Sequence, residues 1–258
     1  MEILALDHYP FGIAAIVIFI ILTFMCQNLF IRFFGTARIR ESHEVGGYYL
    51  SIAGTFYAVL LGLVVVDAMS NFKDAEKTLE DEAAAVMNIH TMSERFPLKM
   101  LQIKELTRVY ANLVLTEDLP LMAKGQFSIR ARDAAINLIE ALKDIEPTTE
   151  NQKALYPSLL TQAQALWDCR RDRTRVASYG IPTPEWVVLL VGALVTIAFT
   201  FFFVIESRAI HFAMTGMIAL LIAMSLYLVL LFGAPFSGDL RVSDKAFLVA
   251  VAYFKDRF

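Results

Sequence analysis

Four arginines close together in the second half of the chain form its densest group of side chains able to bind an anion. Arg170, Arg171, Arg173 and Arg175 fall within six residues. Guanidinium groups bind phosphate through paired hydrogen bonds, so this arginine cluster could hold a phosphate or the head group of an anionic lipid. The plainer interpretation, which we favour, is a positive anchor at a junction with a membrane.

A second charged group is acidic and consists of three consecutive residues, Glu80, Asp81 and Glu82. Carboxylate oxygens are the ligands that calcium prefers. A short acidic run is more typical of a solvated helix face. We therefore expect a solvated face here rather than a calcium site.

Residues typical of catalysis or of metal binding form no recognisable pattern. The four histidines are scattered, with no pair four residues apart and no cysteine partner at metal-site spacing. The chain has no GxSxG sequence, no glycine-rich phosphate loop and no CxxC. Its two cysteines, Cys26 and Cys169, give no disulfide framework. We expect no enzyme activity, no cofactor and no metal site.

The composition indicates which elements must position these residues. Of 258 residues, 57% are hydrophobic and 19% charged, and the mean hydropathy of +0.55 is high for a soluble protein. Four segments lack Asp, Glu, Lys and Arg and are long enough to cross a bilayer as helices: residues 11–31, 48–66, 186–205 and 209–234. The chain is therefore expected to lie in a lipid bilayer. A net charge of −3 gives no sign of a nucleic-acid partner.

We expect an all-α fold in which four transmembrane helices, arranged as two hairpin-like pairs, flank a helical bundle close to the membrane. Spans 1 and 2 occupy residues 1–70, the soluble bundle residues 71–180, spans 3 and 4 residues 181–238, and an amphipathic tail residues 239–258. The start of the chain lacks the basic region of a signal peptide, so span 1 is expected to remain as an anchor.

Within the bundle, apolar residues recur at helical spacing and prolines separate the helices. We expect a break at Pro97, a second helix that stops before Pro120, a third helix capped by Ser128, and a fourth that begins near Tyr156. The first bundle helix can continue directly from span 2, because no helix breaker separates the two.

The C-terminal tail is too short and too charged to cross a membrane. Phe247, Leu248, Val251 and Phe254 share one helical face, and Ser243 is a suitable N-cap. We expect a short helix docked against the protein; the alternative is a helix that lies on the lipid surface.

The second span carries a stripe of small residues, Gly54, Ala58 and Gly62, spaced by four. Such stripes let helices approach closely in lipid. The stripe predicts helix packing, either within one chain or between subunits; a pore-lining face is a further alternative. Asp67 lies at the bundle end of this span, where it is either an interfacial anchor or part of an ion entrance.

The charges near the span ends give conflicting indications of which side the bundle faces. Acidic residues before span 1 and basic residues after it favour a bundle outside the cell. Eight basic residues on the bundle side, against four on the other, favour a cytoplasmic bundle. We favour the second arrangement, in a multi-pass protein of the inner (plasma) membrane.

Three sequence segments recur together in known proteins. They are GTFYAVLLGLVVVD at residues 54–67, YANLV at 110–114 with LP at 119–120, and PFSG at 235–238. In this order and spacing they resemble a bacterial family of membrane proteins described as bestrophin-like. The likeness covers nearly the whole chain. One departure is that Glu117 is followed by Asp118, where the family pattern has an aromatic residue.

Bestrophins proper are pentameric anion channels whose second spans line a narrow hydrophobic neck, with a large cytoplasmic helical region. The resemblance thus implies that Phe56, Leu60 and Leu63 are neck residues, with Asp67 close to them, and that inorganic anions permeate. Apolar constrictions can gate by dewetting. The acidic calcium-clasp pattern of animal bestrophins is not recognisable here, so the resemblance implies no calcium gating.

Two functions are compatible with the sequence. The first is a homo-oligomeric ion channel whose second span faces the axis. The alternative is a membrane sensor or scaffold that acts through its helical bundle and a partner. The oligomeric state separates them, because a closed ring of five or more subunits favours the channel and a dimer favours the sensor.

Overall fold

A computed structural model describes residues 6–35, 43–178, 180–203 and 207–256 of the chain. All regular elements in these residues are helices, so the expected all-α class is confirmed. The chain forms two compact units. The membrane unit consists of Met1–Asn71, Ile181–Ala234 and Gly238–Leu240, and the bundle unit of Phe72–Gly180, Pro235–Ser237 and Arg241–Phe258. We describe each unit by itself.

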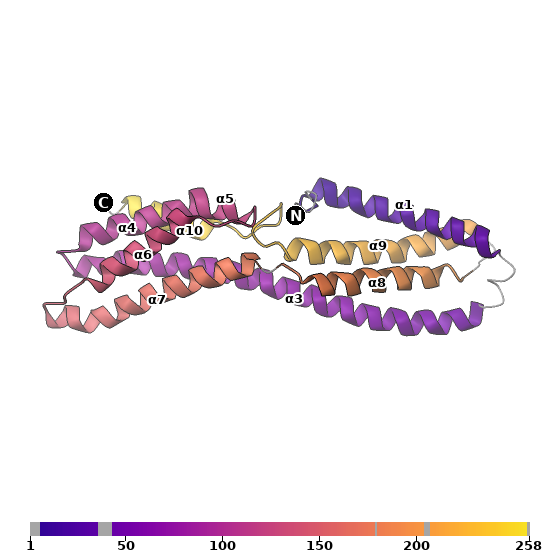
Figure 1. Cartoon of the computed structure of the whole chain (residues 1–258), viewed down its shortest axis with the longest axis horizontal. Coiled ribbons are helices and arrows are strands. Elements are labelled where there is room, and N and C mark those ends of the chain that lie inside the picture. The colour runs from indigo at the N-terminus through magenta and orange to yellow at the C-terminus, as the bar shows by residue number, and fades with distance from the viewer. Residues whose placement is uncertain (1–5, 36–42, 179, 204–206, 257–258) are drawn as a thin grey trace. The chain divides into compact units, whose positions relative to one another are not determined.

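The membrane unit contains the four expected spans (Figure 1). They are α1 (Tyr9–Phe34), the first part of α3 (His43–Met92), α8 (Thr183–Thr200) and α9 (Arg208–Phe232). Each is long and apolar enough to cross a membrane. As expected, α3 continues without a break into the bundle unit.

Aromatic rings of one helix lie over glycines of another inside the membrane unit. A Cβ atom added to Gly12 of α1 would lie 2.1 Å from the ring of Tyr227 on α9. One added to Gly192 of α8 would lie 2.4 Å from the ring of Tyr57 on α3. Because lipid is as apolar as the helices, such close packing is a main source of helix association. The glycines therefore set the distance between these helices.

The pairing of α1 with α9 rests on further contacts (Figure 1). The ring of Phe24 on α1 lies over Gly216 of α9, where an added Cβ would come within 2.8 Å of it. The buried amide of Gln27 donates to the Thr215 hydroxyl, 3.1 Å away. Helix α1 thus packs on α9, and α3 contacts α8 through Tyr57.

The bundle unit is built from the second part of α3 and four further long helices. These are α4 (Met100–Leu113), α6 (Ile129–Lys143), α7 (Glu150–Ser178) and α10 (Lys245–Asp256). Short elements connect them: the 3₁₀ turn η1 (Ser93–Arg95), the π-helical turn η2 (Val114–Asp118) and α5 (Leu119–Met122). Helix α4 packs against α6 and α10, and α6 against α7.

Two of the expected helix boundaries are confirmed and two are wrong. The chain leaves α3 and η1 before Pro97, and the Ser128 hydroxyl accepts a hydrogen bond from the backbone N–H of Ala131, 3.1 Å away, at the start of α6. The second helix does not stop before Pro120, because η2 continues it into α5. Pro120 lies in the first turn of α5, where a missing N–H is tolerated.

The fourth bundle helix, α7, begins at Glu150 and not near Tyr156. A capping box explains the early start. The Gln152 backbone N–H donates to the Thr149 hydroxyl at 3.3 Å, and the Gln152 side chain accepts from the Thr149 backbone N–H, also at 3.3 Å. Pro157 then lies inside the helix.

The C-terminal helix α10 is docked against the protein, as expected. Phe247 and Phe254 are fully buried in the core of the bundle unit, and the His90 ring stacks on Phe254 with 4.3 Å between ring centres. The proposed face is wrong in one residue, since Leu248 is 51% exposed. Val251, the fourth residue of the predicted face, is buried.

Candidate functional site

Within the membrane unit, one side of α3 faces the protomer's own helices. Tyr57, Leu61 and Ala68 are buried, and all three lie on the same side of the helix. Tyr57 covers Gly192 of α8, and Leu61 belongs to the same apolar core. This side of α3 is therefore used within the chain.

A stripe of large apolar residues runs along another side of α3 and is exposed. Its members are Ile52, Phe56, Val59, Leu63 and Val66. The steps between them alternate between four and three residues, which is the spacing of residues that meet another helix in a coiled coil. Phe56 is 76% exposed, the highest value in this apolar stripe.

The apolar stripe contains two of the three predicted neck residues, Phe56 and Leu63. The third, Leu60, lies at its edge and is partly buried against the core of the membrane unit. Asp67 follows Leu63 by four residues, so it lies one turn further along the same side. Its carboxylate is exposed and accepts a hydrogen bond from the Asn71 amide at 3.1 Å.

Among the residues that the structure describes, the small-residue stripe of α3 makes no close contact with another helix. Among the described residues, no atom lies within 4 Å of a Cβ added to Gly54 or Gly62, and Ala58 is exposed. The described residues thus give no sign that this stripe packs within one chain. Packing between subunits stays a prediction.

The bundle unit holds a buried cluster of charges. The Arg173 guanidinium on α7 donates to Glu82 of α3 at 2.5 Å and to Asp118 of η2 at 2.9 Å. Arg170 donates to the same Asp118 at 2.6 Å, and the hydroxyl of Tyr110 donates to Glu82. The side chains of the four charged residues are at most 5% exposed.

This charge cluster corrects two expectations. Arg170 and Arg173 are buried and paired with carboxylates, so they are not contacts for lipid head groups. Glu82 is fully buried, so the acidic run is not one solvated face; Glu80 and Asp81 are exposed. No group of three His, Cys, Asp or Glu suited to a metal ion occurs among the described residues.

The electrostatics of the charge cluster favour its ionised form. Burial acts to raise the pKa of Asp118, but Arg173, Arg170 and the Ser128 backbone N–H together bring it below its ordinary value. Burial, followed by the negative charge of Glu82, raises the pKa of Tyr110. At neutral pH the Asp118 carboxylate is thus ionised beside two guanidinium groups and the Tyr110 phenol is neutral, an arrangement suited to holding helices together.

The other two members of the arginine cluster lie at the surface. The side chains of Arg171 and Arg175 are 65% and 67% exposed. Each pairs with an aspartate three residues earlier, Arg171 with Asp168 at 3.1 Å and Arg175 with Asp172 at 3.6 Å. Contact of these two with lipid or with an anion stays a prediction.

The family-like segments have structural roles in this arrangement. Tyr110 of YANLV is part of the charge cluster, and Asp118, where the chain departs from the family pattern, binds both arginines. In PFSG, Gly238 has φ of +74°, and an added Cβ would lie 2.5 Å from the carbonyl oxygen of Asp7. Only glycine fits this position without strain.

Comparisons with known proteins agree with this architecture. No curated protein matches the chain. Two variants of a bacterial bestrophin homologue from Klebsiella pneumoniae superpose on the chain with a TM-score of 0.73. The first is 11% identical and covers 93% of this chain and 98% of its own length. The second is 10% identical and covers 94% of this chain and 98% of its own length. A crystal structure described as that of a membrane protein gives the same TM-score, with 10% identity over 94% of this chain and 98% of its own.

These superpositions show that the chain has the fold of bacterial bestrophin homologues. Four of its helices are long and apolar enough to cross a membrane. The model of the Bestrophin-like domain matches residues 17–247, which is most of the sequence. The chain belongs to the bestrophin-like family.

Proposed function

We propose that the protein is a homo-oligomeric ion channel of the inner membrane in which the apolar stripe of α3 lines the pore. The observation that carries the proposal is that some glycines of the spans contact other helices of the protomer and others do not. Gly12, Gly192 and Gly216 each face an aromatic ring of the same protomer. Gly54 and Gly62 of α3 face open space. These two are therefore available to a neighbouring subunit.

The three sides of α3 fit a ring of identical subunits. At 3.6 residues per turn, the centre of the apolar stripe lies roughly 160° from the centre of the buried side with Tyr57 and roughly 120° from the centre of the small-residue stripe. One flank of α3 then packs on its own α8, and the other can pack on a neighbour. The side between the two flanks, with Phe56 and Leu63, faces the axis.

A pore lined in this way would combine an apolar neck with one charged ring. Large apolar side chains can gate a narrow passage by dewetting. Asp67 is the only Asp, Glu, Lys or Arg in residues 46–71, and in a ring its copies would carry negative charge at one mouth. Such rings favour cations, whereas the family resemblance favours anions. Replacing Asp67 by Asn should therefore shift permeation toward chloride.

The test is ion flux from liposomes that hold the purified protein, with chloride and potassium compared. Phe56→Ala should raise the flux, because it widens the apolar neck. Phe11→Ala is the matched control: Phe11 is 57% exposed on α1, and its loss should leave the flux unchanged. Vesicles that stay tight with folded, inserted protein would contradict the channel and favour the sensor or scaffold. An equal effect of both substitutions on the flux would show that α3 does not line the pore.

A further inference from the structure

We propose that a pocket in the bundle unit, between the start of α6 and the second half of α7, binds a small planar organic anion. The cavity measures about 580 Å³. Cavities of roughly 300–1,000 Å³ are typical of small-molecule sites. This site is separate from the apolar stripe and does not depend on the channel proposal.

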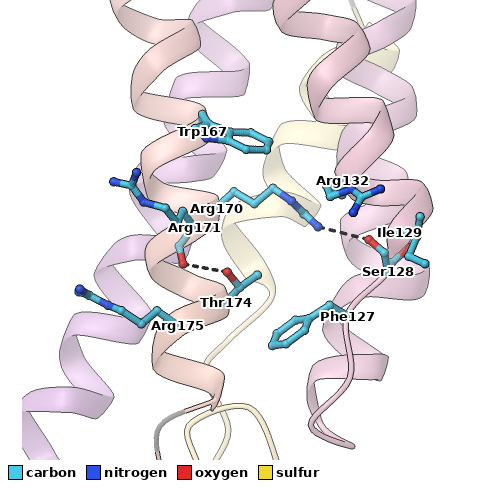
Figure 2. Close-up of a pocket in the computed structure, with 9 residues that line it drawn as sticks. All are labelled: Phe127, Ser128, Ile129, Arg132, Trp167, Arg170, Arg171, Thr174 and Arg175. Atoms are coloured by element: carbon cyan, nitrogen blue, oxygen red, sulfur yellow. Dashed lines mark hydrogen bonds between the residues drawn. The ribbon is translucent and has the colours of Figure 1, made fainter.

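Two aromatic side chains enter the pocket from opposite walls. Figure 2 shows the ring of Trp167 projecting from α7 and that of Phe127 projecting from the segment before α6, with the Arg170 side chain crossing between them. Phe127 is 38% exposed and Trp167 is half-buried. The face of either ring can accept a flat apolar body by stacking.

All charged side chains that line the pocket are positive. Its lining includes four arginines and no Asp or Glu. Arg170 is held in place by Asp118 at 2.6 Å and by the Ser128 carbonyl at 3.4 Å, so it forms a fixed wall. Figure 2 shows Arg171 and Arg175 directed away from the pocket, which leaves Arg132 as the arginine available to a ligand.

Arg132 can change its partner at little cost. Its side chain is 55% exposed and pairs with the adjacent Asp133 at 2.9 Å. An exposed pair of this kind contributes little to stability, so a carboxylate or phosphate can replace Asp133. Arg132 also lies in the first turn of α6, whose N-terminus carries partial positive charge. A ligand therefore needs an anionic group near Arg132 and a flat body that stacks on one of the two rings, beside the Arg170 side chain.

The chain allows a direct binding assay, because it has two tryptophans. Trp186→Phe leaves Trp167 as the single tryptophan in the purified full-length protein, and its emission is selected by excitation beyond the tyrosine absorption band. We would titrate this variant with AMP, with adenosine and with inorganic phosphate, and repeat the AMP titration by equilibrium dialysis. AMP should quench Trp167 and bind at least about tenfold more tightly than either fragment, since only AMP supplies both the ring and the anion.

Arg132→Gln should weaken AMP binding by about tenfold, the effect expected for loss of one charge-assisted contact. Arg130→Gln is the matched control, because Arg130 lies on the same turn, pairs with Glu117 and does not line the pocket. Phe127→Ala should also weaken binding, while circular dichroism reports whether the fold is kept. Absence of AMP binding at millimolar concentration, or equal losses in Arg132→Gln and Arg130→Gln, would overturn the proposal.

Discussion

The guanidinium of Arg173 contacts two carboxylates from different elements, Glu82 of α3 and Asp118 of η2, with no exposure to solvent. Removing one partner of a buried ion pair leaves charges without compensation and costs about 3–5 kcal/mol. We therefore expect Arg173→Met to lower the midpoint of thermal unfolding strongly, as followed by circular dichroism in detergent.

Arg171→Met provides the control, because Arg171 is two residues away and its exposed pair with Asp168 should contribute about 1 kcal/mol or less. The double variant Arg173→Met with Glu82→Gln should recover part of the loss, since Glu82 no longer leaves an unpaired charge. Equal shifts for the two arginine variants would show that the buried cluster does not hold the bundle together.

The same residues show what the sequence could not reveal. Arg170, Arg171, Arg173 and Arg175 form one group in the sequence, but a helix turns by roughly 100° per residue and sends them to different sides. Which side is buried depends on where η2 places Asp118, and this acid is more than fifty residues earlier in the chain. Spacing alone therefore predicted four arginines that act together, as a membrane anchor or as an anion-binding cluster, where the structure has two buried and two exposed arginines.

At the scale of elements, the apolar runs predicted all four spans, because a charge-free run of bilayer length has few other solutions. The start of α7 was predictable too, because Thr149 and Gln152 have the spacing of a capping box. We relied on the prolines as helix boundaries instead and predicted a start near Tyr156. The π-helical turn η2 had no sequence signal that we recognise. Asp118 lies in this turn, so the role of Asp118 as partner of the buried arginines could not be predicted without predicting η2.

Glycines in two spans should respond differently to added side chains. Gly62→Leu meets open space in the protomer, so it should keep the helix content yet reduce the number of subunits, because it blocks the small-residue stripe. Light scattering coupled to size-exclusion chromatography measures this change.

Gly192→Ala is the contrasting variant. Its Cβ would lie 2.4 Å from the Tyr57 ring, and overpacking of this kind costs about 1–3 kcal/mol. We expect a lower unfolding midpoint with the subunit number unchanged. An unaltered assembly in Gly62→Leu would show that the small-residue stripe does not lie between subunits.

For the whole molecule, the remaining question is which side of the membrane the bundle unit faces. The eight basic residues near the span ends on the bundle side, among them Arg241 and Lys245, exceed the four on the other side. Basic residues are retained on the cytoplasmic side during insertion. We therefore propose that the bundle unit is cytoplasmic.

Single cysteines in a chain that lacks Cys26 and Cys169 test this arrangement. Glu140 on α6 and Ala209 at the start of α9 are both exposed, and the order of the spans puts them on opposite sides of the membrane. In intact bacterial cells, a membrane-impermeant maleimide should label Ala209→Cys, and it should label Glu140→Cys only after lysis. The reverse pattern would place the bundle outside, where the acidic residues before span 1 and the basic residues after it would have determined the orientation.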